Sequence, residues 1–163
     1  MSSVLDLLTD HEVRRFNVGE TVINEGERTG LLYFLIEGAV EVRKEGVLLF
    51  ASSEPGTVFG ELSTLLGGNH LASVSALKPC AFYVVSDPRA FLAMSPAVCF
   101  HVCETLATRL NAMLEYLRDI RRQFEDHDHI GMVDQVLETL VHRKPRARAR
   151  PSDSTIHQGE PLD

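Results

Sequence analysis

Short apolar runs separated by turn residues fill the N-terminal half of the chain. From Glu12 to about Val85, the runs VRRF, ETVI, LLYFLI, AVEVRK, VLLFA, LASVSA and CAFYVVS alternate with NVG, NEGERTG, EG, EPG and LKP. Within LIEGAVEV, Glu41 and Arg43 alternate with Val40 and Val42, as in a half-buried strand. Many short strands with Gly and Pro between them favour an antiparallel β-barrel or jelly roll.

One short segment interrupts this strand pattern. Glu61–Leu66 follows Gly60 and is closed by Gly67 and Gly68, which predicts a helix of one or two turns. The start of such a helix presents backbone N–H groups that can receive an anion. The presence of Glu61 in the first turn also has a simpler explanation, because the helix dipole stabilises a carboxylate there without any ligand.

After Asp87 the apolar residues follow a helical period. Pro88–Met94 predicts a short helix, and a long helix is expected from Pro96 to about Phe124. Apolar residues on the long helix recur at alternating steps of four and three, and we predict that they form a dimer seam: Leu106, Leu110, Met113, Leu117, Ile120 and Phe124. Such a narrow seam on a polar helix favours a homodimeric coiled coil, although packing along its own barrel explains the first half equally well.

The pattern predicts four parts and an α+β, mainly β, fold. Residues 1–95 form the antiparallel barrel with its short internal helix, and residues 96–125 form the long closing and dimerisation helix. Residues 130–143 form a further amphipathic helix. Residues 144–163 are rich in Pro, Arg and Ser and are expected to form a mobile basic tail.

Composition narrows the class of protein. A chain of 163 residues with 44% apolar and 24% charged residues suits one soluble domain with an appended piece. Residues 1–142 hold 11 of the 16 Lys and Arg residues but 20 of the 23 Asp and Glu residues, which argues against sequence-specific nucleic-acid binding. No basic leader or spanning apolar run is visible, so we expect a cytoplasmic protein without a membrane partner.

Candidate catalytic and metal-binding groups all have ordinary structural explanations. His127 and His129 lie in a polar turn without a second anchored pair of ligands. Cys99, His101 and Cys103 share one helix, where the two cysteines are expected to be core residues. No serine or cysteine is accompanied by a recognisable base and acid, so we predict no catalytic site, no metal site and no enzyme.

Several short motifs, taken together, resemble the cyclic nucleotide-binding domain family, which includes the catabolite activator protein and kinase A regulatory subunits. The order and spacing of four motifs carry the resemblance: GETVINEG, LYFLIEGAVEV, PGTVFGEL and ASVSAL. In that family Gly60 would let the backbone approach the ligand, Glu61 would receive the ribose 2′-hydroxyl, and amides at the helix start would hold the cyclic phosphate. The resemblance implies these ligand-binding residues: Phe59, Gly60, Glu61, Leu62, Ser63, His70, Leu71 and Ala72.

The sequence departs from the family pattern at both ends of the implied site. His70 stands where the family has an arginine, and the loss of that charged, bidentate group is expected to cost roughly 1.5–3 kcal/mol of binding. Leu71 replaces a small residue. The positions implied to face the base, Met113 and Leu114, have no hydrogen-bonding side chain that could select adenine.

These observations predict a non-enzymatic regulatory module that senses cyclic AMP or cyclic GMP with weak or altered affinity, and no other cofactor. The alternative is a ligand-free dimeric scaffold that presents its C-terminal helix and tail to a protein partner. Only 39 residues follow Phe124, which argues against an added DNA-binding domain.

Overall fold

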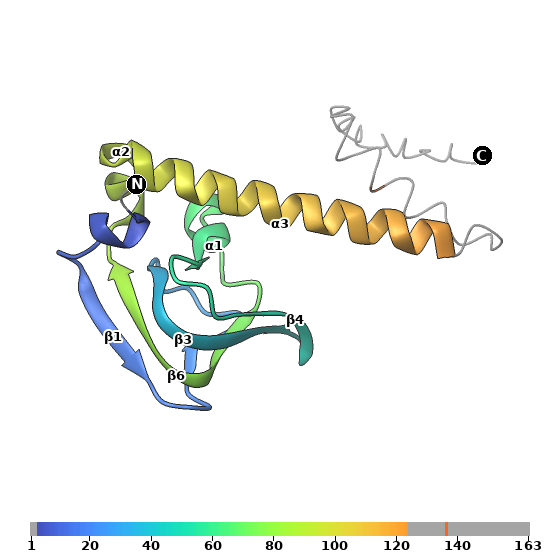
Figure 1. Ribbon diagram of the computed structural model, residues 1–163, viewed down its shortest axis with the longest axis horizontal. Helices are drawn as coiled ribbons and strands as arrows, with labels where there is room; N and C mark the ends of the chain where they lie inside the picture. The colour runs from blue at the N-terminus through green and yellow to red at the C-terminus, as the bar shows by residue number, and fades with distance from the viewer. Residues whose placement is uncertain (1–2, 124–135, 137–163) are drawn as a thin grey trace, which may run out of the picture. The chain divides into compact units, whose positions relative to one another are not determined.

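The computed structural model describes residues 3–123 and residue 136, and it divides the chain into two compact units, Met1–Ala112 and Met113–Asp163. The elements in order are η1 (Val4–Leu7), β1 (Glu12–Phe16), β2 (Thr21–Ile23), β3 (Leu32–Lys44), β4 (Val47–Ser52), β5 (Val58–Phe59), α1 (Glu61–Leu66), β6 (Ser73–Val85), α2 (Pro88–Met94) and α3 (Pro96–Gln123). Every strand in the described residues belongs to the first unit (Figure 1). The expected C-terminal helix, the basic tail, Phe124, and the His127 and His129 turn lie outside the described residues, apart from Val136.

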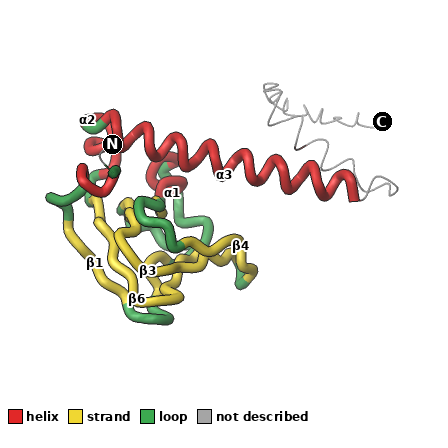
Figure 2. The backbone as a smooth tube through the Cα atoms, in the orientation of Figure 1, coloured by secondary structure: helices red, strands yellow, loops and turns green. Residues whose placement is uncertain are grey.

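The strands form one antiparallel sheet of six strands. Its hydrogen-bonded path runs β1-β6-β3-β4, while β2 pairs with β6 and β5 pairs with β3. The two long strands β3 and β6 pair along most of their length and curve strongly (Figures 1 and 2). The predicted mainly β, jelly-roll-like fold is therefore confirmed, although the sheet is open rather than a closed barrel.

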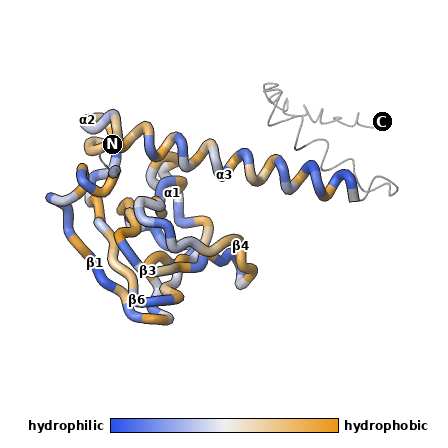
Figure 3. Tube along the Cα trace, viewed as in Figure 1, coloured by the Kyte–Doolittle hydropathy of each residue, from blue (hydrophilic) through white to orange (hydrophobic). Residues whose placement is uncertain are grey.

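The first part of β3, residues 32–35, is buried on both faces, which explains its unbroken apolar run. Tyr33 and Leu35 point into one core cluster, while Leu32 and Phe34 point into the other. This alternation follows from the period of two in a strand. In the first cluster, Phe82 packs edge-to-face against Tyr33, and further aromatic rings surround it. The hydropathy colouring shows the same mixture of apolar and polar positions along the strands (Figure 3).

The second core cluster joins the sheet to the helices. Val98 and Val102 of α3 are buried in it, and Leu106 packs against it one turn further on. Their spacing of four places them on one face of the helix. The first part of α3 therefore packs on its own sheet, as one of the two explanations of the sequence pattern predicted.

Local signals fix the start of α2. The Asp87 side chain accepts a hydrogen bond from the Ala90 amide at 3.3 Å, and Pro88 occupies the first turn. Both features are typical of helix N-termini.

Within the described residues, no single helix meets the length and hydropathy needed to cross a membrane; α2 and α3 do so only when this sharply bent pair is counted together. The same residues contain no group of three His, Cys, Asp or Glu side chains arranged for a metal ion. The three cysteines are free. Cys99 is half-buried against the second core cluster, but Cys103 is exposed, so the prediction that Cys103 is a core residue is wrong.

Candidate functional site

The loop before α1 depends on a glycine. Gly60 has φ of 85°, a left-handed conformation, and a Cβ atom at this position would lie 2.7 Å from the Leu31 carbonyl oxygen. Only glycine avoids both the strain and the clash. At the other end of α1, the Gly67 amide donates to the Ser63 carbonyl, and Arg89 of α2 donates to the Leu65 carbonyl at 2.9 Å. The cassette, defined here as Phe59–Ala72, is thus fixed at both ends of its helix.

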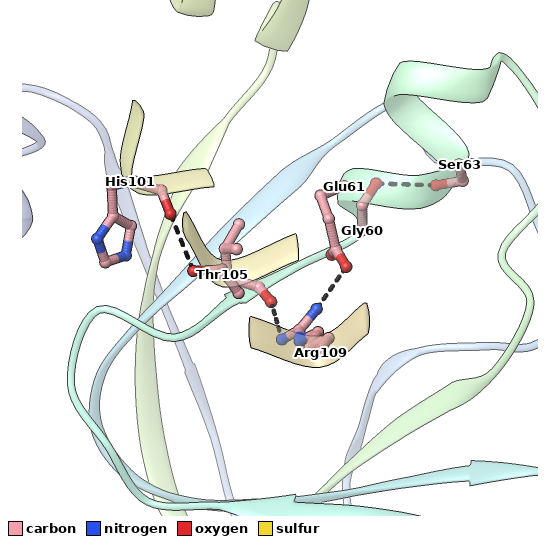
Figure 4. Close-up of polar contacts among 7 residues, drawn as sticks. Gly60, Glu61, Ser63, His101, Thr105 and Arg109 are labelled. Atoms are coloured by element: carbon pink, nitrogen blue, oxygen red, sulfur yellow. Dashed lines mark hydrogen bonds and ion pairs between the residues drawn. The ribbon is translucent and has the colours of Figure 1, made fainter. Parts of the chain in front are cut away.

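Glu61 is buried, with only 4% of its surface exposed, and its carboxylate is paired with a cation from α3. The Arg109 guanidinium donates to Glu61 Oε1 and, through its other terminal nitrogen, to the Val58 carbonyl at 2.7 Å (Figure 4). It also lies 5.2 Å from the Phe50 ring centre and 5.6 Å from that of Phe59, within the range of cation–π attraction. Arg109 therefore joins α3 to the cassette and to the sheet.

One face of α3 carries a row of polar contacts toward this region. His101, Thr105 and Arg109 follow at steps of four, which places them on the same side of the helix (Figure 4). His101 Nε2 donates to the Gly56 carbonyl at 2.8 Å, and the Thr105 hydroxyl donates to the His101 carbonyl. His101 thus binds a backbone carbonyl just before β5, and Arg109 binds one within β5.

His70 is buried, with 5% of its surface exposed, and both ring nitrogens have hydroxyl partners. Nδ1 lies 2.8 Å from Ser63 Oγ, and Nε2 lies 2.8 Å from Thr29 Oγ1. Ser63 also lies 3.0 Å from the Gly60 carbonyl, which can only accept a hydrogen bond, so the Ser63 hydroxyl hydrogen points there. The network therefore assigns the neutral Nδ1–H tautomer, in which Nδ1 donates to Ser63 and Nε2 accepts from Thr29.

Burial lowers the pKa of His70 below its ordinary value of 6.5, and the nearby carboxylates of Glu27 and Glu61 oppose this shift only in part. The ring is therefore neutral at neutral pH. In this state it supplies no charge to the position where the resemblance expects an arginine.

The other predicted cassette residues divide between the core and the surface. Phe59 and Ser63 are buried, and Ala72 packs against the first core cluster. Leu62 and Leu71 are exposed, Leu71 by 53%. The structure thus buries Glu61, Ser63 and His70 within the cassette, while Leu62 and Leu71 are exposed.

The residues predicted for the base and the dimer seam have mixed environments. Met113 is 58% exposed and Leu114 half-buried; both belong to the second compact unit, so a contact with a base stays a prediction. Of the seam, Leu110 is 47% exposed, and Leu117 and Ile120 are half-buried. Leu106 packs on the core of its own chain.

Sequence reasoning missed Arg109, Thr29 and Phe50. A signal for Arg109 was present, because it is the one Lys or Arg between Arg89 and Arg118, on a stretch otherwise suited to packing. Thr29 and Phe50 gave no comparable signal, since each lies in an ordinary turn or strand context.

Comparisons with known proteins agree with this geometry. Residues 13–94 match the family model described as "Cyclic nucleotide-binding domain". The cAMP-dependent protein kinase regulatory subunit of Yarrowia lipolytica is 36% identical over 81 residues, which is 50% of this chain and 20% of that protein. The cAMP-activated global transcriptional regulator CRP of Pasteurella multocida is 26% identical over 160 residues, covering 91% of this chain and 72% of that protein.

Solved structures show the same fold. The catabolite activator protein of Thermus thermophilus superposes with a TM-score of 0.59 at 24% identity, over 85% of this chain and 83% of that one. The structure described as Sp-2Cl-cAMPS bound to PKAR CBD2 superposes with a TM-score of 0.54 at 20% identity, over 72% of this chain and 85% of that one. This chain spans only a fifth of the Yarrowia protein, so the match to that relative is one of domain rather than of whole protein. Because the family model matches residues 13–94 and the fold is shared, the chain belongs to the cyclic nucleotide-binding domain family.

Proposed function

We propose that the protein is a cytoplasmic, non-enzymatic regulatory module that binds cyclic AMP or cyclic GMP at the cassette. Family membership supports the class of ligand. The single observation that carries the regulatory role is the contact between Glu61 of the cassette and Arg109 of α3. It connects the segment that would hold the ligand to the helix that would transmit its presence.

The proposed mechanism is a competition for the Glu61 carboxylate. A ribose hydroxyl that reaches Glu61 must share this carboxylate with Arg109 or replace it. Either event changes how firmly the first part of α3 is held against the cassette. A ligand shifts such an equilibrium by its differential affinity for the two arrangements.

Affinity for a cyclic phosphate is expected to be weak or altered at neutral pH. His70 is neutral and both of its nitrogens are engaged, whereas an arginine would offer a permanently charged fork of donors. The exposed Leu71 adds bulk beside it.

Thermal unfolding with added nucleotide tests the ligand hypothesis. Binding to the folded state alone raises stability by about 2.7 kcal/mol at a hundredfold excess over Kd, so cyclic AMP or cyclic GMP should raise the Tm. Glu61→Ala should abolish the shift. The control Glu54→Ala removes an exposed carboxylate from the segment between β4 and β5 and should keep the shift. Equal shifts in both variants would exclude Glu61 from the site.

We also propose a homodimer through the apolar seam of α3. The exposed side chains of Leu110 and Met113 support this, because a helix in water gains by covering apolar residues that recur in heptads. Light scattering should report monomers for Leu110→Asp combined with Leu117→Asp. The control Thr108→Asp combined with Ala112→Asp adds the same two charges at exposed positions off the seam and should leave the mass of the dimer unchanged.

A ligand-free scaffold is the second candidate function. It is favoured because the buried polar side chains of the cassette already have partners within the protein. Arg109 already neutralises Glu61, and two hydroxyls already satisfy His70. In this role the sheet and α3 would present the predicted C-terminal helix and tail to a protein partner. No Tm shift at millimolar cyclic nucleotide, together with loss of the dimer in the seam variant, would select this candidate.

A further inference from the structure

The hydrogen-bond network around His70 accommodates two protonation states. In the neutral state, Thr29 donates to Nε2 and Nδ1 donates to Ser63. Thr29 is exposed, so its hydroxyl hydrogen can turn to solvent, and its oxygen can then accept from a protonated Nε2. The bond to Ser63 is the same in both states. Protonation therefore breaks no hydrogen bond inside the protein, and the burial of a charge is its main cost.

Charged groups on several elements face this ring. Glu27, in the segment between β2 and β3, and Glu61, in α1, both favour the charged imidazole. Arg109 of α3 pairs with Glu61 and so weakens that contribution. Burial raises the pKa of Tyr33 of β3, so this side chain carries no charge at neutral pH. Burial outweighs these groups in the absence of a ligand, and the pKa of His70 lies below its ordinary value.

We propose that the cassette binds its cyclic phosphate together with one proton, which His70 takes up. This inference rests on the proposed function, because it requires a cyclic phosphate in the cassette. A phosphodiester would add one negative charge to a cassette in which the His70 ring already faces two carboxylates, Glu27 and Glu61. Protonation converts the neutral imidazole into a cation at the position where the family has an arginine. A proton from the solvent bonds to the Nε2 lone pair, and no other covalent bond changes.

The consequence is a histidine that makes nucleotide affinity depend on pH. If binding takes up one proton, the apparent Kd falls by up to tenfold for each unit of decreasing pH, between the pKa of His70 in the complex and its pKa in the free protein. An arginine at the same position stays charged and gives no such dependence. His70 is thus a specificity-determining residue that allows tight binding only when protons are available.

Calorimetry of the wild-type protein tests this without any variant. Cyclic AMP and cyclic GMP are titrated from about pH 5.5 to about pH 8, in two buffers with different enthalpies of ionisation. We expect affinity to rise toward acid pH. The difference in heat between buffers should correspond to uptake of about one proton where the affinity is steepest.

Two substitutions assign the proton to His70 rather than to another histidine. His70→Gln should bind weakly with little dependence on pH, and His70→Arg should bind more tightly at about pH 8, also without that dependence. Circular dichroism first confirms that each variant is folded. A histidine elsewhere, such as His11 or His101, would leave the linkage intact in His70→Gln and so overturn the proposal.

The remaining outcomes separate this inference from the proposed function. Wild-type binding that is independent of pH overturns the proton linkage and leaves the nucleotide-binding function standing. Binding by His70→Arg alone, with none by the wild type at any pH, also overturns the linkage. If neither the wild type nor either His70 variant binds cyclic AMP or cyclic GMP at any pH, both proposals are overturned.

Discussion

The two buried polar side chains of the cassette, Glu61 and His70, are stabilised in opposite ways. Glu61 is paired with a counter-charge, Arg109, from a distant helix. His70 has no charge and has two neutral hydroxyl partners close to the cassette. The Glu61–Arg109 ion pair depends on the position of α3, which carries Arg109. A neutral hydrogen-bonded ring is independent of α3 but sensitive to protons.

This difference suggests a division of roles within one site. The Glu61 end couples the cassette to the helix, since its partner belongs to α3. Under the proposed proton linkage, the His70 end makes nucleotide affinity depend on pH, since its charge is not fixed. A single arginine at position 70 would remove the second role and leave the first intact.

Breaking the Glu61 end should have the largest effect on stability. Arg109→Ala leaves a buried carboxylate without its counter-charge and removes the donor to the Val58 carbonyl. Loss of one partner of a buried ion pair costs about 3–5 kcal/mol, and the lower end applies because the Arg109 side chain is 28% exposed. Urea unfolding should therefore show a loss of about 3 kcal/mol.

An exposed ion pair provides the matched control. Arg15 and Glu37 lie 3.3 Å apart with both side chains largely in solvent, so Arg15→Ala should cost less than about 1 kcal/mol. Replacing both members of the buried pair, Arg109→Met with Glu61→Gln, should recover much of the lost stability. Equal losses for Arg109→Ala and Arg15→Ala would show that the Glu61 charge is not buried in solution.

The two hydroxyl partners of His70 should differ in importance. Ser63 is buried, so Ser63→Ala leaves the His70 Nδ1–H without an acceptor and should cost about 1–3 kcal/mol. Thr29 is exposed, so water can replace its hydroxyl, and Thr29→Ala should cost about 0.5–1 kcal/mol. Comparison of the two variants by urea unfolding checks the order. A larger loss for Thr29→Ala would contradict the burial of the Nδ1 side of the ring.

Features determined by neighbouring residues could be predicted from the sequence. The strands followed from their alternation, α1 from its flanking glycines, and the start of α2 from Asp87 and Pro88. The open edges of the sheet could not be predicted, because a hydropathy pattern is the same for an open and a closed antiparallel sheet. The position of Glu61 in the cassette followed from the order of the family motifs.

The partners of the two buried side chains could not be predicted, because each comes from far along the chain. Arg109 is 48 residues from Glu61, and Thr29 is 41 residues from His70. A local pattern gives no information on such contacts. For the same reason the sequence indicated that His70 lacks the charge and reach of an arginine, but not that its ring is enclosed and fully hydrogen-bonded.

The smallest predicted effect is the change with pH in the unfolding free energy of the ligand-free protein. The pKa of His70 is lowered in the folded state, so below about 6.5 the unfolded chain binds more protons than the folded protein at this residue. Acid therefore favours the unfolded state. The contribution of His70 to stability should be fully present above pH 6.5 and should decrease as the pH falls toward the lowered value. Urea unfolding at a series of pH values measures this decrease.

The matched variant His70→Gln has no titrating group at this position and corrects for all other ionisations. The difference in unfolding free energy between wild type and variant should be constant above neutrality, and should shift against the wild type as the pH falls below about 6.5. A shift in favour of the wild type would mean that Glu27 and Glu61 outweigh burial and that the ring is already charged. In that case the His70 end would resemble the Glu61 end, as a second charged pair, and the proton would be bound before any nucleotide arrives.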